Sequence, residues 1–195
     1  MAREIDHAAL DQLFLSARTR NRWSDRPVTA ETLRRLYDVL KMGPTTSNSL
    51  PARFVFLTSR DAKRRIEPAL DEGNRAKSMQ APVLTIVAYD LRFYEFLGDT
   101  FAHNRDARSW FEGKPDLDRT ALRNGTLQGA YLILAARALG LDCGPMSGFD
   151  EAKVNAEFFP DGRWRANFLC ALGHADDKPF PRLPRLPFET ACRVL

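Results

Sequence analysis

Residues 53–58 (RFVFLT) and 83–89 (VLTIVAY) are the two stretches that decide the fold class of this chain. Both are rich in β-branched and aromatic residues, which predicts two strands in the core of a sheet. Residues 62–70 between them have a helical pattern, and residues 165–173 (RANFLCALG) predict a third strand. Because strands alternate with helices, the sequence indicates a mixed α/β or α+β domain.

Two helices are predicted before the first strand. The first is an amphipathic helix in the opening segment, and its end delivers the basic segment 18–23; its apolar residues at helical spacing are Leu10, Leu13, Phe14 and Ala17. The second begins after Thr29, a residue type that caps helix N-termini, and ends at Gly43-Pro44. Its predicted buried face consists of Leu33, Leu36, Tyr37 and Leu40. A polar loop at 45–49 then leads into the first strand.

A long helix is predicted over residues 116–139, ending at Gly140. Apolar residues occupy most of its faces near residues 127–134, so we expect it to be buried. Gly125 and Gly129 inside it each cost about 1 kcal/mol of helix stability relative to Ala. A helix accepts that cost where something packs closely against it, such as a second backbone. Further along, Asp150 predicts the cap of another short helix.

Two segments have no regular pattern. Residues 91–115 hold six large aromatic residues without helical or strand periodicity, which predicts an irregular excursion or short helices that form a lid over a pocket. Residues 178–187 hold four of the 12 prolines. We therefore expect the C-terminal tail at 178–195 to run extended along a surface, either its own or that of a partner.

The composition is close to that of an average soluble globular protein, with 44% hydrophobic and 28% charged residues among 195. We therefore expect a single domain over residues 1–195 with a sizeable core. The longest unbroken apolar run, residues 130–136, is too short to span a membrane, and the first ten residues lack a secretory signal, so a cytoplasmic location is expected. Cys143, Cys170 and Cys192 form no CxxC pair and fit reduced thiols.

The charge and the missing motifs give several classes of function little support. A formal net charge of +4 suggests an anionic partner, but the arginine clusters lack the aromatic interleaving of an RNA-recognition sheet, so no nucleic-acid partner is expected. Without GxxxxGK[ST] or GxGxxG, neither a P-loop nor a Rossmann site is expected. The isolated histidines give no zinc site, and GPMSG at 144–148 lacks the spacing of a serine-hydrolase elbow.

Several unusual stretches remain: Arg-Thr-x-Asn at 18–21, GPTTSN at 43–48, Gly-Asn-x-x-Lys at 73–77, GPMSGF at 144–149, and Arg185. Each alone is a weak signal. Together they supply cationic groups for a phosphate and hydroxyl and amide groups for a polar ring edge. They also supply glycines where a backbone must approach a flat ligand.

These stretches resemble the FMN-dependent nitroreductase family, most closely its RutE/HadB branch, which includes the malonic-semialdehyde reductase of pyrimidine breakdown. The resemblance covers the chain from about residue 10 to the C-terminus, and its most specific pieces are GPTTSNSLPARFVF (43–56), DARSWF (106–111), ALGLDCGPMSGFD (138–150) and RLPRLPFE (182–189). It implies a three-layer α+β fold with a central, mainly antiparallel sheet flanked by helices. It also implies an intertwined homodimer that binds two FMN molecules at the interface.

The resemblance further implies which residues bind the flavin. Those expected at the phosphate and ribityl chain are Arg18, Thr19, Asn21 and Arg185. Those expected to reach the flavin of the other subunit are Thr45, Thr46 and Asn48. Asn74 and Lys77 match residues at the pyrimidine edge, where a cation stabilises reduced flavin. The turn expected near flavin N5 consists of Pro145, Met146, Ser147 and Gly148.

The sequence departs from the family pattern at three of these places. Asn21 stands where many members have a basic residue, Ser147 where Glu is frequent, and Leu183 where some members have a second C-terminal base. Arg20, Arg22 and Arg182 are the arginines available to replace the missing charges.

The implied reaction is a ping-pong transfer of hydride from NADH or NADPH through flavin N5 to a small-molecule oxidant, with no catalytic side chain. Malonic semialdehyde would give 3-hydroxypropionate, and its carboxylate needs a cation, for which Arg108 is the first candidate and Arg105 the second. Three alternatives stay open: a general quinone or nitroaromatic reductase, an FMN-binding protein without turnover, and a basic nucleic-acid-binding module.

Overall fold

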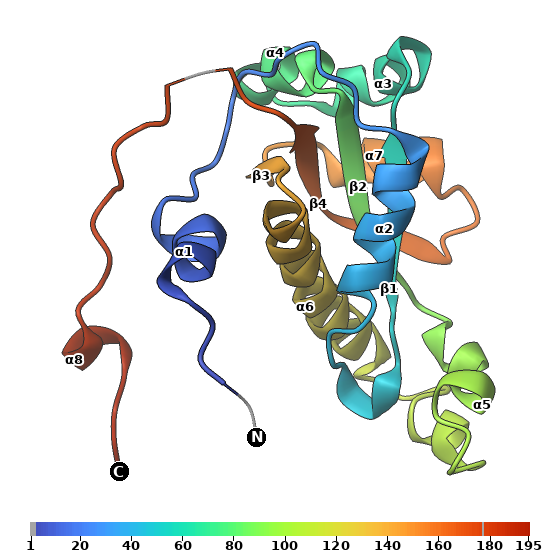
Figure 1. Ribbon diagram of the computed structural model, residues 1–195. Helices are drawn as coiled ribbons and strands as arrows, with labels where there is room; N and C mark the ends of the chain where they lie inside the picture. Colours follow the sequence, from blue (N-terminus) through green and yellow to red (C-terminus); the bar gives the residue numbers. More distant parts are fainter. Residues whose placement is uncertain (1–2, 177) are drawn as a thin grey trace.

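The centre of the molecule is a four-stranded sheet in the order β1-β2-β4-β3, in which every neighbouring pair is antiparallel (Figure 1). The computed structural model describes residues 3–176 and 178–195. Its strands are β1 (Ala52–Leu57), β2 (Val83–Asp90), β3 (Asp142–Met146) and β4 (Trp164–Gly173). The antiparallel α+β architecture predicted from the resemblance is therefore confirmed.

Three of the strands are those that the sequence predicted, and β3 was not predicted. Its sequence, DCGPM, contains Gly and Pro and therefore lacks the β-branched residues that mark a strand. The strand forms because it lies at the edge of the sheet, where a Pro without an N–H group is tolerated. Its pairing with β4 runs from Asp142–Gly173 to Met146–Leu169.

Helices occur between the strands and at both ends of the chain. The α-helices are α1 (His7–Leu10), α2 (Ala30–Leu40), α3 (Arg60–Ile66), α4 (Glu72–Gln80), α5 (Leu97–Thr100), α6 (Leu117–Ala138), α7 (Glu151–Phe158) and α8 (Phe188–Ala191). Short 3₁₀ turns cover Thr46–Asn48, Glu67–Ala69, Phe93–Phe96 and Ala107–Trp110, and a π-helical turn covers Asp11–Leu15. The predicted caps are present, since Thr29 Oγ1 accepts from Thr32 N and Asp150 Oδ1 accepts from Lys153 N.

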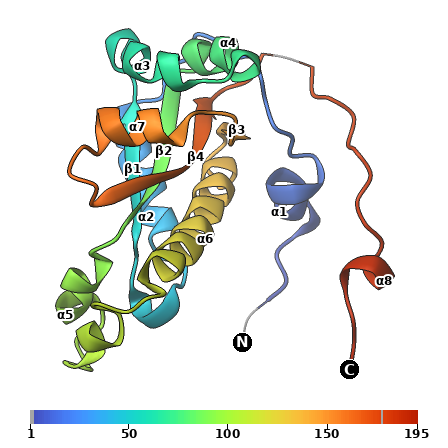
Figure 2. The same cartoon turned by 180° about the vertical axis from the view of Figure 1, so that it is seen from behind.

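The helices cover both faces of the sheet, which gives the three layers. One face packs Val83 and Val87 of β2 against Leu36 of α2 and Leu132 of α6. The opposite face packs Leu84 and Ile86 of β2 against α3 and α7. Figures 1 and 2 show α2 and α7 on opposite sides of the strands. Because β2 is covered on both faces, all eight of its residues are buried.

Helix α6 has the predicted position, but it is buried along only part of its surface. Leu122 and Leu127 are 40% and 43% exposed, so the prediction of burial on most faces was wrong there. Gly125 and Gly129 do face the sheet, and a Cβ on them would lie 3.0 Å from Tyr89 Cβ and 2.5 Å from the Phe168 ring. Side chains of the sheet, rather than a second backbone, therefore require these glycines.

The first two helices also differ in detail from the prediction. The N-terminal helical segment spans residues 7–15, so Ala17, which was placed on its apolar face, lies beyond its end, and Phe14 is half exposed. Tyr37, predicted on the buried face of α2, is 47% exposed. Both rings lie beside cavities that are described below.

Residues 91–115 form the predicted excursion of short helical turns, which projects from one end of the sheet (Figure 1). Its base is fixed by the buried carboxylate of Asp90, which accepts hydrogen bonds from Arg53, from Arg163 and from the backbone of Arg92. The ring of Phe93 is fully buried there.

Residues 178–187 of the C-terminal tail form no helix or strand, whereas Phe188–Ala191 form α8, so the extended run expected over 178–195 is interrupted by a helical turn. Both views place the tail beside α1, on the far side of α6 from β1 (Figures 1 and 2). The guanidinium of Arg182 holds it there by donating to the carbonyl oxygens of Phe14 and Ala17. None of the described helices combines the length and apolar character that crossing a bilayer requires.

Candidate functional site

The basic segment after the first helix lies along the edge strand β3. Thr19 forms a parallel bridge with Cys143, and the backbone N–H of Arg20 donates to the carbonyl oxygen of Cys143 at 3.0 Å. A Cβ on Gly144 would lie 2.7 Å from the carbonyl oxygen of Arg20. Gly144 therefore allows the backbone of β3 to approach the backbone of the basic segment closely. The basic segment lines two cavities, one through Thr19 and the other through Asn21.

The first of these, the arginine cavity, has a volume of about 590 Å³ and lies between the segment 14–19 and the tail. The basic residues that line it are Arg18, Arg137, Arg182 and Arg185, and Thr19 adds a hydroxyl. Two of the predicted phosphate-binding residues, Arg18 and Arg185, are thus brought together although 167 positions separate them (185 − 18). Arg182, one of the arginines that the sequence offers to replace a missing phosphate-binding base, lines the same cavity.

The positive charge of the arginine cavity is not neutralised by any carboxylate of the part of the chain that the structure describes. The guanidinium of Arg18 donates instead to the carbonyl oxygens of Leu15, Ala17 and Phe180. Desolvation, together with repulsion from Arg18, Arg185 and Arg137, lowers the pKa of Arg182. A cluster of guanidinium groups without a counter-ion is suited to a multiply charged anion such as a phosphate.

The second cavity, here the Lys77 cavity, has a volume of about 790 Å³. Asn21 and Arg22 line it from the basic segment, and Gly73 and Lys77 line it from α4. The indole N–H of Trp23 donates to the carbonyl oxygen of Lys77 at 3.0 Å and so fixes α4 to the segment. Partial burial lowers the pKa of Lys77.

The turn after β3 contacts α4. The Asn74 side chain donates to the carbonyl oxygen of Gly148, and the hydroxyl of Ser78 donates to the sulfur of Met146. Pro145 is partly buried beside Met146 in β3, and Ser147 is exposed. The structure therefore brings together Asn74, Met146 and Gly148 at the same end of the sheet as Lys77.

The polar loop, residues 45–49, lies at the opposite end of the sheet from α4 (Figures 1 and 2). Thr45 Oγ1 accepts from the backbone of Leu50, the backbone of Thr46 donates to Asn124, and the Asn48 amide donates to the carbonyl oxygen of Thr100. Within one chain, Thr45, Thr46 and Asn48 are therefore not brought to the other predicted site residues.

Arg108, the predicted ligand for a substrate carboxylate, is engaged within the excursion. It makes a bidentate ion pair with Glu112 at 2.6 and 2.8 Å and lies 5.5 Å from the centre of the Tyr94 ring. The side chains of Arg108 and Glu112 are about half exposed. Arg105, the second candidate, is exposed on the same excursion.

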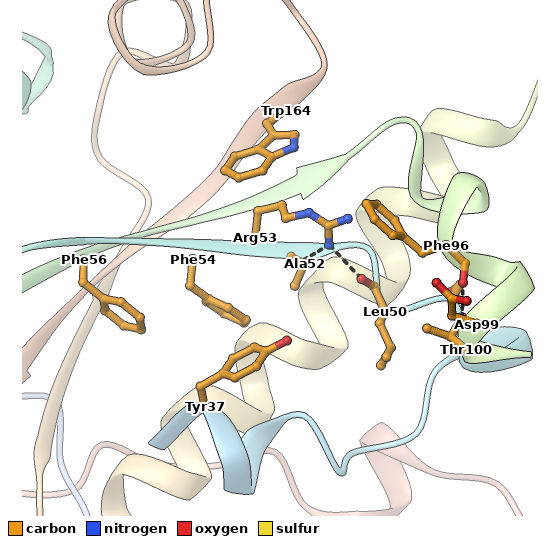
Figure 3. Close-up of a pocket in the computed structure, with 11 residues that line it drawn as sticks. Tyr37, Leu50, Ala52, Arg53, Phe54, Phe56, Phe96, Asp99, Thr100 and Trp164 are labelled. Atoms are coloured by element: carbon orange, nitrogen blue, oxygen red, sulfur yellow. Dashed lines mark hydrogen bonds between the residues drawn. The ribbon is translucent and has the colours of Figure 1, made fainter. Parts of the chain in front are cut away.

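A third cavity, here the β1 groove, has a volume of about 430 Å³ and follows the unpaired edge of β1. Figure 3 shows Tyr37, Phe54 and Phe56 on one side of β1 and Arg53 with Trp164 on the other. The Arg53 guanidinium lies 5.2 and 5.8 Å from the centres of the Phe96 and Trp164 rings. Ser49 also lines the groove, and its buried hydroxyl has no hydrogen-bond partner among the described residues.

Sequence reasoning missed two features of these sites. Arg137 joins the arginine cavity from the last turn of α6, and only its position near the helix end could have drawn attention to it. Asn124 and Gln128 are buried in α6 and bind the ends of segment 46–52. Their four-residue spacing inside an otherwise apolar stripe was a signal that could have been used.

Comparisons with known proteins agree with this arrangement. The protein-family model described as the nitroreductase family matches residues 16–174. A Ralstonia nicotianae protein, provisionally named an NADH dehydrogenase/NAD(P)H nitroreductase, is 56% identical over 193 residues, which are 98% of each chain. A provisionally named NADH dehydrogenase/NAD(P)H nitroreductase from Stenotrophomonas maltophilia K279a is also 56% identical, over the full length of both chains.

The fold is likewise shared with solved structures. A provisionally named nitroreductase from Exiguobacterium sibiricum, solved in complex with FMN, superposes with a TM-score of 0.87 at 19% identity and covers 100% of this chain and 99% of its own. At that identity the likeness concerns the fold alone. Because the family model matches most of the chain and relatives more than half identical align with it nearly end to end, this chain belongs to the nitroreductase family.

Proposed function

We propose that this protein binds FMN and works as an NAD(P)H-dependent oxidoreductase. The observation that carries the proposal is the arginine cavity, which is lined by Arg18, Arg137, Arg182 and Arg185 and by no carboxylate of the described residues. Within this family, the ligand whose chemistry matches that cluster is a flavin phosphate. The names of the relatives, which include NAD(P)H nitroreductase, and the FMN complex of a structural neighbour support the same reading.

The residues present fit FMN at both of its ends. The Arg18, Arg185 and Thr19 side chains are suited to hold the phosphate, because guanidinium groups bind phosphate oxygens in bidentate fashion. Asn21 lines the Lys77 cavity, where the Lys77 ammonium is suited to the pyrimidine edge of the ring. The amide of Asn74 lies on the same helix and contacts the turn after β3. Gly148 has no room for a Cβ because the Asn74 and Asp71 side chains fill that space, so the glycine lets the turn after β3 pack closely beside the helix of Lys77.

When bound, FMN supplies a ring that accepts hydride from NAD(P)H and donates it to an oxidant. The protein's part is to hold and tune that ring. The ammonium of Lys77 offsets negative charge at the pyrimidine edge, and the backbone of the turn 145–148 closes one side of the site. No protein side chain needs to act as acid or base for the hydride step itself.

We further propose that two chains assemble into the working enzyme. The polar loop lies at the end of the sheet away from the Lys77 cavity, so Thr45, Thr46 and Asn48 reach a flavin only if it is bound by a second copy. The β1 groove offers an unpaired strand edge with aromatic walls. The tail carries exposed apolar side chains, with Leu186 72% and Phe188 59% exposed, which a second copy could cover.

Two classes of oxidant are proposed, and they differ in whether Arg108 is needed to bind a carboxylate of the substrate. Malonic semialdehyde, the substrate implied by the branch resemblance, carries a carboxylate that needs the guanidinium. The ion pair of Arg108 with Glu112 favours the alternative, a neutral quinone or nitroaromatic compound, because the guanidinium is already occupied. An FMN-binding protein without turnover is the remaining possibility.

One set of measurements tests these proposals. Purified protein should be yellow and hold about one FMN per chain, and NADPH or NADH should bleach the bound flavin rapidly. The kcat/KM values for malonic semialdehyde, menadione and a nitrofuran then rank the oxidant classes. If the protein binds FMN but neither nucleotide reduces the bound flavin, the proposed oxidoreductase activity is excluded. If the purified protein is colourless and does not bind added FMN, the proposed FMN site is excluded.

A further inference from the structure

Three side chains of α6 form a single stripe that faces residues 43–52. They are Asn124, Gln128 and Tyr131, at helix positions i, i+4 and i+7, which lie on one face. Asn124 and Gln128 are 1% and 3% exposed. A buried amide inside a helix is retained only where its polar atoms are satisfied, so what these side chains bind is informative.

Each of the three side chains binds the backbone of the facing segment. Asn124 Oδ1 accepts from the N–H of Thr46 at 2.9 Å, and Gln128 Oε1 accepts from the N–H of Ala52 at 2.8 Å. The Tyr131 hydroxyl donates to the carbonyl oxygen of Pro44 at 2.9 Å. The segment is therefore attached to α6 before, at the start of and after the polar loop.

The backbone between Thr46 and Ala52, the two residues that the side-chain amides bind, is strained. Ser47, Asn48 and Leu50 have φ values of 49°, 46° and 43°, in the left-handed region that residues other than glycine rarely adopt. Such conformations persist only where the surroundings hold them, and they cluster at functional sites. All three lie between Thr46 and Ala52, the residues that the two amides bind.

We infer that Asn124 and Gln128 are positioning residues. They hold the polar loop in the strained conformation in which its side chains face the flavin of a second copy. The inference rests on the proposed function, in which this loop faces the flavin of a second copy. Neither amide belongs to the loop, and neither lines any of the three cavities described above. They act through the backbone of Thr46 and Ala52, and thereby on the side chains of Thr45 and Asn48.

The experiment uses pairs of variants that keep side-chain size but differ in the acceptor atom. Asn124→Leu and Gln128→Met remove the acceptor, whereas Asn124→Asp and Gln128→Glu keep an oxygen at the same place. The matched control is Asn155→Leu, because Asn155 Oδ1 accepts from the backbone N–H of Ala166 at 2.8 Å and so makes the same kind of bond away from the loop. Each variant is measured at the same number of degrees below its own melting temperature.

The first readout is amide hydrogen exchange of a peptide covering residues 44–52 in the FMN-free protein. We expect exchange about tenfold faster or more in Asn124→Leu and Gln128→Met, because the bonded N–H groups of Thr46 and Ala52 lose their acceptors. We expect protection to return in Asn124→Asp and in Gln128→Glu, and to stay unchanged in Asn155→Leu. Equal acceleration in Asn155→Leu, or full protection in both acceptor-free variants, would overturn the positioning role.

The second readout is the dissociation constant of FMN, which we expect to rise about tenfold in the acceptor-free variants only. Faster loop exchange with unchanged FMN affinity and unchanged KM for the oxidant would overturn the link between the loop and the flavin. If the unaltered protein binds no FMN at all, the proposed function fails, while the exchange experiment still decides whether α6 holds the loop.

Discussion

The side-chain amide of Asn74 donates a hydrogen bond of 2.8 Å to the carbonyl oxygen of Gly148 and so joins α4 to the turn after β3. The backbone of Asp71 donates to the same carbonyl oxygen at 3.2 Å. A Cβ on Gly148 would lie 2.4 Å from Asn74 Nδ2 and 2.7 Å from Asp71 Oδ2. The turn and α4 therefore constrain each other at the proposed ring site.

Gly148→Ala should displace the Asn74 amide and lower FMN affinity by about tenfold. Because the clashing atoms are the ends of side chains that can move, the loss of stability should stay near 1 kcal/mol. Gly98→Ala is the control, since a Cβ there meets nothing within 4 Å. Fluorescence titration with FMN and urea unfolding measure both effects, and equal FMN affinity in Gly148→Ala and the unaltered protein would remove Gly148 from the site.

Arg18→Met and Arg185→Met should each weaken FMN binding by about tenfold to a hundredfold and leave riboflavin binding nearly unchanged. Riboflavin lacks the phosphate that the arginine cavity is proposed to hold, so the ratio of the two affinities isolates that contact. Arg35→Met makes the same change of charge on the exposed side of α2 and serves as control. A parallel loss for both ligands would show that the arginines support the fold rather than the phosphate.

Arg108→Ala should raise KM for malonic semialdehyde about tenfold and leave KM for menadione unchanged, if the guanidinium receives the substrate carboxylate. Glu112→Gln should have the opposite effect on malonic semialdehyde, because it releases Arg108 from its ion pair. Steady-state kinetics of both variants with both oxidants are the measurement. Equal changes for the charged and the neutral oxidant would assign Arg108 to the excursion alone.

Phe188→Asp should weaken the proposed dimer, because it replaces an exposed apolar side chain of the tail, which a second copy is proposed to cover, with a charged one. We expect the apparent molar mass from light scattering to fall from that of two chains towards 22.1 kDa, with loss of bound FMN. Glu189→Gln, a change at the neighbouring residue that adds no charge, should remain dimeric. An unaltered protein that is already a monomer while holding a full complement of FMN would refute the two-chain site.

Tyr89 gives the protein a predicted sensitivity to alkaline pH. Burial, together with the neighbouring Asp118 carboxylate, raises the pKa of Tyr89 to about 12. An unfolded tyrosine has a pKa of about 10, so the folded state binds this proton more tightly. The resulting stabilisation is complete below about pH 10 and is lost as the pH rises through 12.

Tyr89→Phe should therefore make the free energy of unfolding fall less steeply between pH 10 and 12, by up to about 2 kcal/mol over that range. Urea unfolding at several pH values tests this, and the absorbance at 295 nm of the folded variant should lack the last tyrosine to ionise. Identical pH slopes for the variant and the unaltered protein would show that the buried hydroxyl has no such role.

Local sequence determined much of the framework. The β-branched runs at 53–58 and 83–89 form β1 and β2 because their residues suit a buried pleated surface, and the N-caps at Thr29 and Asp150 form because their side chains reach backbone N–H groups three residues away. Strand β3 could not be predicted, because the Gly and Pro in DCGPM are permitted only by its place at the sheet edge. Helix α4 was likewise not predicted, since EGNRAKSMQ has hardly any apolar periodicity.

The sequence by itself determined three of the four strands of the described sheet, the helices that carry an apolar face and, through the family resemblance, which residues to examine at a flavin site. The tertiary structure alone decided which charges meet: Arg137 joins Arg18 and Arg185 because α6 ends beside the first helix and the tail. It also decided that Arg108 pairs with Glu112 and that the polar loop lies away from Lys77. The physical reason is that electrostatic and hydrogen-bond contacts depend on distances in space, which local sequence patterns do not encode.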